Sequence, residues 1–268
     1  MPSYTEAAGE HLRRMVSELS EPATIKEMEN ILHFLARWRS RLLANTYAVH
    51  EHNVVQLGPF AGLHYATRAT EGAMMPRLLG TYETELHPHL LRFAAQDLDC
   101  VIDVGCAEGY YAVGLARLMP GVTVHAFDTS ADARAACALN ARDNGVEAQV
   151  VIGATFAPED FQAFAGRRAL VIMDVEGAED ELLLPDRAPA LAHMRVIVET
   201  HEGHRPGVRQ RLIDRFSPTH EVLVVDHGGR PQTLPPWIRE LGHLDHLLAV
   251  WEFRTGPTPW LVMTPKSG

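Results

Sequence analysis

Residue types suited to a ligand site first appear in the middle of the chain, in the segment Val101–Tyr110 (VIDVGCAEGY). An apolar run that contains Asp103 leads into a turn of small residues, and a helix is expected to follow. Glycine lets the backbone turn tightly and come close to a ligand, and the first turn of a helix has unpaired N–H groups. We therefore expect a cofactor site here. The expected contacts are Asp103, Gly105, Cys106, Ala107, Gly109 and Tyr110.

The spacing of the small residues indicates which cofactor binds. A dinucleotide site has the pattern G-x-G-x-x-G, but Ala107 and Tyr110 break that pattern, and no Gly-Lys-Ser/Thr follows. The carboxylate of Asp103 would repel a pyrophosphate and would attract the α-amino group of S-adenosylmethionine, which has no phosphate. Asp128 closes the next apolar run, 19 residues after the last glycine of the segment, and that position suits a carboxylate that binds both ribose hydroxyls. Asp128 and the adjacent Thr129 complete the expected cofactor contacts.

Acidic and histidine side chains cluster after two later apolar runs, the fourth and the fifth of the series. Asp174 and Glu176 follow the fourth run, and Glu199, His201 and His204 end or follow the fifth. Ligands of open parallel sheets bind beyond the carboxyl ends of the strands, so we expect these side chains on one rim beside the cofactor. Asp174, Glu199 and His201 are the candidate catalytic residues, and Asp174 is also a candidate cofactor contact.

Two chemical roles for Asp174, Glu199 and His201 stay open. In the first, they bind a divalent metal, Mg²⁺ or Mn²⁺, that holds an acceptor hydroxyl and lowers its pKa. In the second, no metal takes part and a histidine or carboxylate is the general base. A structural interpretation is also open, in which the acids cap the next helix or pair with an arginine.

The elements that must position these residues alternate along the second half of the chain. Short apolar runs predict strands at residues 101–104, 122–127, 148–152, 169–173 and 195–198. Helices are predicted between and after them at residues 110–118, 131–143, 159–164, 179–184 and 207–216. This alternation predicts a parallel sheet, and two further strands at residues 220–225 and 260–263 suggest an antiparallel pair at its end. The expected fold is α/β: a Rossmann-like, doubly wound, mostly parallel sheet with an antiparallel last strand and a helical N-terminal extension.

The N-terminal extension covers residues 1–84, and residues 85–268 form the cofactor-binding domain. Apolar residues at three- and four-residue spacing predict a helix from residue 25 and a second helical piece over residues 37–50. We expect this segment to be a lid, a substrate cap or a dimer contact. A short helix is expected over residues 83–95, and the stretch with Tyr82 and Glu83 would pass over the cofactor by analogy with related folds.

Composition narrows the class of partner. The net charge of −10 argues against binding to a phosphate backbone, so we expect a small-molecule substrate and no nucleic acid. The 3 cysteines have no C-x-x-C spacing, which removes support for zinc and redox motifs and suits a reducing cytosol. No signal peptide or bilayer-spanning apolar stretch is visible, so we expect a cytoplasmic protein that does not enter a membrane. A homodimer is compatible with these features.

The segments described above resemble those of class I S-adenosylmethionine-dependent methyltransferases and, more narrowly, of the FkbM-type family. Ile172–Glu179 (IMDVEGAE) is close to that family's Asp-Val-Glu-Gly-Ala-Glu signature, and alanine instead of glycine at position 107 is a substitution associated with the same family. The resemblance covers about residues 100–200. It implies methyl transfer from S-adenosylmethionine, commonly to an oxygen of a sugar or a small natural product.

Two other functions stay open for this sequence. A Rossmann-like protein could bind the nucleoside without chemistry, although a mere binder does not need the acid-rich ends of the fourth and fifth strands. An oxidoreductase with a dinucleotide cofactor is the third interpretation, and the broken G-x-G-x-x-G pattern argues against it.

Overall fold

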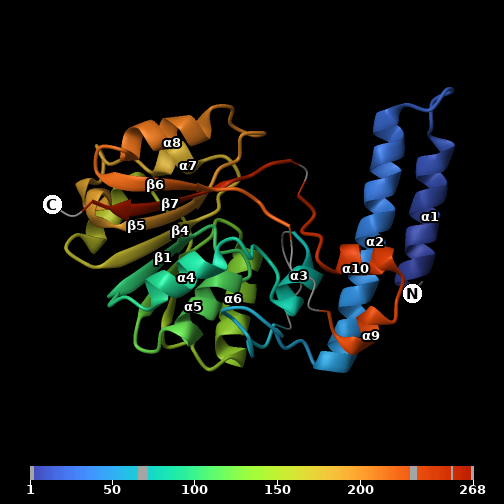
Figure 1. The fold of residues 1–268 in the computed structure, drawn as a ribbon, viewed down its shortest axis with the longest axis horizontal. Helices are drawn as coiled ribbons and strands as arrows, with labels where there is room; N and C mark the ends of the chain where they lie inside the picture. Colours follow the sequence, from blue (N-terminus) through green and yellow to red (C-terminus); the bar gives the residue numbers. More distant parts are fainter. Residues whose placement is uncertain (1–2, 66–71, 230–233, 255, 267–268) are drawn as a thin grey trace.

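The computed structural model describes residues 3–65, 72–229, 234–254 and 256–266, which form a seven-stranded sheet flanked by helices (Figure 1). The strands are β1 (Cys100–Val104), β2 (Thr123–Phe127), β3 (Val150–Gly153), β4 (Ala169–Met173), β5 (Arg195–Glu199), β6 (His220–Val225) and β7 (Trp260–Pro265). Their order is β3-β2-β1-β4-β5-β7-β6, and β7 runs antiparallel to both of its neighbours. The predicted fold class is therefore confirmed.

The helices are distributed over both faces of this sheet and over the N-terminal segment. They are α1 (Tyr4–Ser17), α2 (Ile25–Glu51), α3 (Met74–Leu79), α4 (His87–Ala94), α5 (Tyr110–Leu118), α6 (Ala131–Asp143), η1 (Pro158–Phe164), α7 (Glu179–Leu182), η2 (Pro189–His193), α8 (Val208–Phe216), α9 (Pro236–Arg239) and α10 (His243–Ala249). Helices α4, α5 and α6 contribute to one hydrophobic core, and η1, η2 and α8 contribute to the other. Successive residues of a strand point to opposite faces, so Val101 enters the first core and Ile102 the second.

Several predicted helices have different bounds or geometry in the structure, among them the helix expected over residues 179–184, which ends at Leu182 as α7. The pieces expected before and after residue 36 form one continuous helix, α2, because no glycine or proline interrupts the run. The helix expected from Glu83 begins at His87, because Glu83 has a left-handed backbone with φ 49° and forms a turn. The segment that contains residues 159–164 is a 3₁₀ helix, η1.

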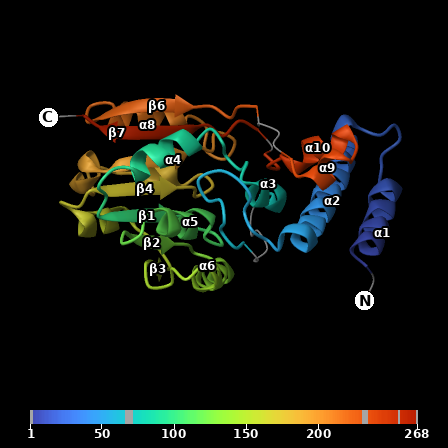
Figure 2. The same ribbon diagram turned by 60° about the horizontal axis from the view of Figure 1, so that its bottom comes forward.

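Helix α1 and the outer half of α2 form a hairpin that extends away from the sheet (Figures 1 and 2). No residue of α1 is buried, and the buried residues of α2 all lie between Ser40 and Tyr47. There the Tyr47 hydroxyl lies 2.8 Å from the Val54 carbonyl oxygen and 3.1 Å from that of Leu78, so α2 is joined to the loop before α3 and to α3 itself. The division of the chain at residue 84 and the role of the hairpin as lid, cap or dimer contact stay predictions.

The segment between β6 and β7, called the C-terminal insertion below, contains α9 and α10. Helix α10 packs against α2. The guanidinium of Arg39 donates to both carboxylate oxygens of Asp245, over 2.6 and 2.7 Å, and joins the two helices. Segments about 200 residues apart in the sequence therefore meet beside the sheet. No helix in the described part of the chain is both long and apolar enough to cross a bilayer.

Candidate functional site

A cavity of about 730 Å³ opens at the carboxyl edge of the parallel strands, where open α/β sheets bind ligands. Its size is within the range of small-molecule sites. Its walls come from the β1–α5 loop, the ends of β4 and β5, and side chains of the N-terminal and C-terminal segments. The lining includes Arg37, Tyr82, Asp103, Gly105, Cys106, Ala107, Tyr110, Asp174, Glu176, Glu199, His201, Glu252 and Arg254.

The β1–α5 loop owes its shape to two glycines. Gly105 has φ +84°, and a Cβ atom there would lie 1.7 Å from the carbonyl oxygen of Asp174. Gly109 has φ +87°, and a Cβ atom there would lie 2.6 Å from the Cys137 sulfur. Ala107, between them, has a left-handed φ of 47° that alanine adopts at a cost of roughly 1 kcal/mol. The loop is therefore held close to β4 and α6 by contacts that no larger side chain at the two glycine positions would permit.

The carboxyl group of Asp103 lies in the wall of the cavity, and one of its two oxygens lacks a hydrogen-bond partner among the described residues. The residue is 2 % exposed, and that oxygen is Oδ2. Burial, together with the nearby Asp128, raises the pKa of Asp103 to about 7. A buried acid of this kind is costly to folding unless a ligand pairs with it, so a cationic ligand group is the partner that this position suits.

Asp128 and Thr129 lie next to the loop but outside the lining of the cavity. The Asp128 carboxylate accepts hydrogen bonds from the Ala107 N–H, over 2.9 Å, and from the Ser130 N–H, over 2.7 Å. Thr129 is exposed, and its carbonyl oxygen accepts from Arg134. Asp128 therefore connects the end of β2 to the loop, a role that the sequence analysis did not foresee.

Cys106 lies near the start of the β1–α5 loop, and Tyr110 is the first residue of α5, directly after the loop. The Cys106 N–H donates to the Phe127 carbonyl oxygen over 2.9 Å, and contact with the Cys137 thiol, followed by burial, raises the pKa of the Cys106 thiol. This thiol therefore stays protonated and unreactive. Tyr110 packs edge-to-face against Tyr82, with ring centroids 5.6 Å apart, so the stretch before β1 does reach the cavity.

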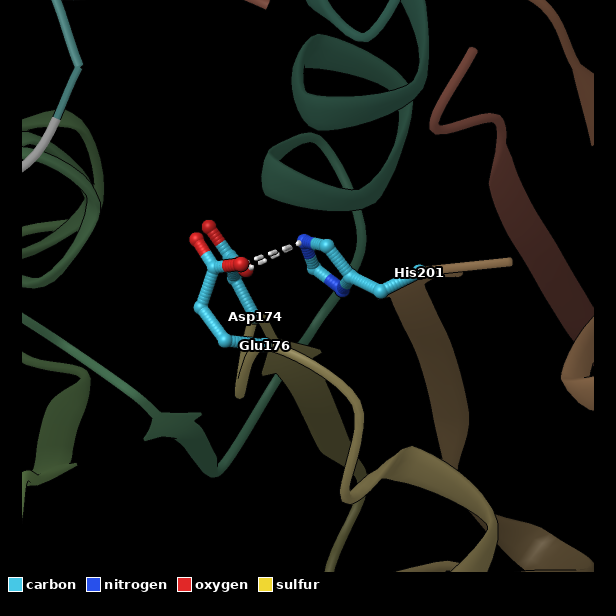
Figure 3. Close-up of side chains that lie close together, drawn as sticks. All are labelled: Asp174, Glu176 and His201. Atoms are coloured by element: carbon cyan, nitrogen blue, oxygen red, sulfur yellow. Dashed lines mark ion pairs between the residues drawn. The ribbon is translucent and has the colours of Figure 1, made fainter. Parts of the chain in front are cut away.

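Three side chains at the ends of β4 and β5 converge in the cavity (Figure 3). The His201 Nε2 atom lies 3.5 Å from Asp174 Oδ1 and 3.4 Å from Glu176 Oε2. One ligand-type atom from each of the three residues can be chosen so that all lie within 4.8 Å of one another, a separation that suits a metal ion. On its other side the ring hydrogen-bonds through Nδ1 to the buried Glu179, over 2.5 Å.

Glu199, the third predicted catalytic residue, has a different partner. Its Oε1 atom accepts a hydrogen bond from Arg254, while its Oε2 atom is 3.7 Å from His201 Nε2. Arg254 also donates to Glu83 Oε1, over 2.6 Å, and to Glu252 Oε2, over 2.9 Å. Glu199 thus belongs to an ion-pair network with Arg254, and Glu176 replaces it in the group of atoms close enough to hold a metal.

Burial and mutual repulsion perturb the acids of this rim. Burial, followed by the negative charge of Glu199, raises the pKa of Asp174 well above its ordinary value and that of Glu83 to about 8. Burial lowers the pKa of His201, but its hydrogen bond to Glu179 and the surrounding carboxylates outweigh burial and hold the pKa above the usual value. Perturbed titration of this kind is concentrated at functional sites.

Sequence reasoning missed two residues of this rim. Glu179 was read as part of a helix, and Arg254 lies in the insertion, where no motif distinguishes it. A carboxylate five residues after Asp174 is a weak signal, since acids are common in the first turn of any helix. Only the tertiary structure shows that the buried Glu179 and the half-buried Arg254 contact the candidate residues.

Comparison with known proteins adds one family match. A family model described as "Methyltransferase small domain" matches residues 88–165, which run from α4 to η1 and include the β1–α5 loop. No curated protein matches the chain. The methyltransferase resemblance is thus supported for the stretch that carries the cofactor segment, whereas the FkbM-type resemblance stays a prediction.

Several solved structures are similar at low identity. They include precorrin-6y C5,15-methyltransferase from Geobacter metallireducens GS-15, with 13 % identity, 68 % of this chain and 90 % of that chain covered, and a TM-score of 0.49. The O-methyltransferase TomG from Streptomyces achromogenes, in complex with SAM, has 12 % identity, 68 % and 81 % coverage, and a TM-score of 0.46. An O-methyltransferase from Bacillus cereus, in complex with SAH, has 14 % identity, 66 % and 78 % coverage, and a TM-score of 0.46. Likenesses at this level carry no argument about the substrate.

The raised pKa of Asp103 predicts how stability depends on pH. Between about pH 4 and pH 7, folded Asp103 keeps a proton that the unfolded chain, with a pKa of about 3.9, has released. The contribution of this residue to the free energy of unfolding therefore falls as pH rises through that window. Asp103→Asn, which has no proton to release, should flatten the decline and raise the melting temperature at about pH 8. Thermal unfolding at several pH values measures this effect, with Asp132→Asn on the exposed start of α6 as the control. An unchanged pH dependence would mean that folded Asp103 is ionised throughout.

Proposed function

We propose that the protein transfers a methyl group from S-adenosylmethionine to a small-molecule acceptor, and that the accepting atom is a hydroxyl oxygen, as in a sugar or a natural product. The observation that supports this function best is the Oδ2 atom of the buried Asp103, which has no hydrogen-bond partner among the described residues and lies at the cavity wall beside the glycine-shaped β1–α5 loop. An ammonium group is the natural partner of such a carboxylate. S-adenosylmethionine carries an ammonium and a sulfonium, and it has no phosphate for the acids of the cavity to repel.

The residues present fit this cofactor on two counts. Gly105 and Gly109 let the loop turn with a left-handed backbone and pack closely on Asp174 and Cys137, and this keeps the loop backbone in the cavity wall, where a ligand can reach it. The cavity wall also carries Asp103, which forms no ion pair with any residue that the structure describes, and this favours a positively charged ligand. When bound, S-adenosylmethionine supplies an activated methyl group on a positively charged sulfur.

His201 is the proposed proton acceptor for the hydroxyl. Glu179 accepts the Nδ1–H of the ring, so the neutral ring keeps its lone pair on Nε2, the atom that faces Asp174 and Glu176. When Nε2 takes the proton of the acceptor hydroxyl, these carboxylates stabilise the imidazolium that forms. His201 and Glu179, called the His201–Glu179 dyad below, therefore combine a base of raised pKa with a fixed ring orientation. General base catalysis requires both.

A divalent metal at Asp174, Glu176 and His201 is the second proposal for how the hydroxyl is activated. The grouping of one nitrogen and two carboxylate oxygens within 4.8 Å favours it. A carboxylate on the far nitrogen of a ligating histidine, as Glu179 provides, is the usual support of such a ligand. The imidazole favours Mn²⁺ over Mg²⁺. Because a metal and a proton would compete for the same Nε2 atom, the two proposals exclude each other in any one turnover.

Cofactor binding is tested first by titration calorimetry of the whole chain with S-adenosylmethionine and S-adenosylhomocysteine. We expect a micromolar dissociation constant, which corresponds to about −8 kcal/mol. Asp128→Ala should weaken binding strongly and leave the fold intact, because it removes the expected ribose contact and the acceptor for the Ala107 N–H. Asp128→Asn, which keeps one acceptor oxygen, should lose less affinity. The lack of any binding by the wild-type protein would contradict the cofactor assignment. Unchanged affinity in folded Asp128→Ala would contradict the ribose contact of Asp128.

The His201–Glu179 dyad is tested without an acceptor, by NMR titration of protein labelled in its histidines. His201, identified by the signal that disappears in His201→Gln, should titrate above about pH 6.5. Glu179→Gln should lower that pKa, because it removes the charge that stabilises the protonated ring. Glu202→Gln is the matched control, since Glu202 accepts only from the backbone N–H groups of residues 207 and 209. The same pKa in Glu179→Gln and wild-type protein would eliminate the dyad as the source of basicity.

The metal proposal is tested with Mn²⁺ alone, by following the loss of the free-ion EPR signal as protein is added. Asp174→Asn and Glu176→Gln should each weaken binding by at least about tenfold. Glu199→Gln separates the two possible ligand sets, because the structure pairs Glu199 with Arg254 and so predicts a smaller effect. Binding that is absent, or that survives both ligand substitutions, would leave the general base as the remaining proposal.

A further inference from the structure

A second cavity, of about 490 Å³, adjoins the first on the side of the N-terminal helices. The two cavities share Arg37, Gly72 and Phe253 in their walls. Arg37 belongs to α2, and Phe253 belongs to the C-terminal segment that also carries Arg254. Space therefore continues from the candidate cofactor site toward α2, and a ligand could extend from one cavity into the other.

One face of α2 forms a wall of this second cavity. Its members recur at spacings of three and four residues, which places them on one side of a helix. They are Arg37, Ser40, Arg41, Ala44, Asn45 and Ala48. A helix face that only packs against a core is apolar, as Leu43 and Tyr47 are on the buried side of the same helix. On the cavity side, the small alanine side chains leave room for a ligand, and the polar side chains can form hydrogen bonds with it.

Two exposed arginines of this face have no acidic partner among the residues that the structure describes. Neither Arg37 nor Arg41 forms an ion pair or a side-chain hydrogen bond with any residue that the structure describes, whereas Arg39 is paired with Asp245. Each guanidinium carbon instead lies 5.6 Å from the centre of an aromatic ring, that of Phe253 for Arg37 and that of Tyr4 for Arg41. Such contacts orient a guanidinium and leave N–H groups free to donate. Like charges four residues apart on a helix also repel, by roughly 0.2–0.5 kcal/mol, unless an anion lies between them.

Ser40 adds a neutral donor on the same face. The residue is only 2 % exposed, and within the described ranges its hydroxyl forms no hydrogen bond. It belongs to the same cavity wall as Arg37 and Arg41. The hydroxyl is therefore available as a donor to a molecule in this cavity. Two guanidinium groups and a hydroxyl together match the acceptor oxygens of a carboxylate or a phosphate.

We propose that the methyl acceptor is an elongated molecule with an oxyanion group, a carboxylate or a phosphate, that binds between Arg37 and Arg41. This inference rests on the proposed function for the other end of the molecule, where the reacting hydroxyl lies beside His201. The charges of the two ends differ: Asp103, Asp174 and Glu176 make the cofactor end acidic, and the α2 end is basic. An anionic group is repelled from the first end and attracted to the second, so the acceptor can enter in only one direction.

The test uses simple anions and the full chain. Orthophosphate and acetate are titrated separately into the protein at constant ionic strength, and binding is followed by the chemical shifts of backbone amides in α2. We expect millimolar binding of at least one anion, and the anion that binds more tightly identifies the class of the acceptor group. Arg41→Gln should weaken this binding at least about threefold, and the double variant Arg37→Gln/Arg41→Gln at least about tenfold, because each substitution removes a charged hydrogen-bond donor to the anion.

The matched control is Arg13→Gln/Arg14→Gln, which removes the same charge from exposed positions of α1 that do not line the cavity. It should bind the anions like wild-type protein. Equal affinity in wild-type and Arg37→Gln/Arg41→Gln protein, or the absence of binding of both anions to wild-type protein, would overturn the proposal. Arg41 lines only the second cavity, so the S-adenosylmethionine titration of wild-type protein reports separately on the proposed function. If wild-type protein bound the anions but not S-adenosylmethionine, the cofactor would be rejected and the anion site would be retained.

Discussion

The close approach of the β1–α5 loop to the end of β4 is the contact on which the arrangement of the site depends. At Gly105 the backbone lies so near the Asp174 carbonyl that no side chain fits between them. This contact sets the position of the loop relative to the fourth strand, and with it the distance between Asp103 and the acids that follow β4. Asp128 reinforces it from the other side through the Ala107 N–H. Three consecutive strands of the sheet, β2, β1 and β4, are thus joined at the edge where the cavity opens.

The acids of this edge fall into two groups with different consequences. Glu83, Glu199 and Glu252 surround the single guanidinium of Arg254, which joins the segment before β1, the end of β5 and the insertion. Each of the three forms an ion pair with Arg254, and together these pairs connect the walls of the cavity. Asp103 forms no ion pair with any described residue, so its burial costs free energy of folding that no charge in the described part of the chain offsets.

The sequence predicted the sheet well because its strands are short apolar runs separated by helices with clear ends. Strand β4 and helices α5 and α6 have the predicted bounds, and Ser130 caps α6 as its position suggests. The rim was predicted only in part. The chain order shows that Asp174 and His201 follow neighbouring strands, but the left-handed backbone of Glu176, which directs its carboxylate toward His201, depends on local geometry that residue types do not reveal. The partners Glu179 and Arg254 depend on tertiary packing in the same way.

The helical hairpin has a consequence for the energetics of the whole molecule. Helix α1 has no buried residue, and its start is held by a local capping box between Ser3 and Glu6, as the start of α2 is held by one between Thr24 and Glu27. Such a unit gains little from the sheet, so it can unfold and refold locally while the strands keep their amide protection. Tyr4, at the beginning of α1, is part of the wall of the second cavity. Local unfolding of α1 would therefore uncover the α2 face without disturbing the β1–α5 loop, because the two regions are stabilised by different contacts.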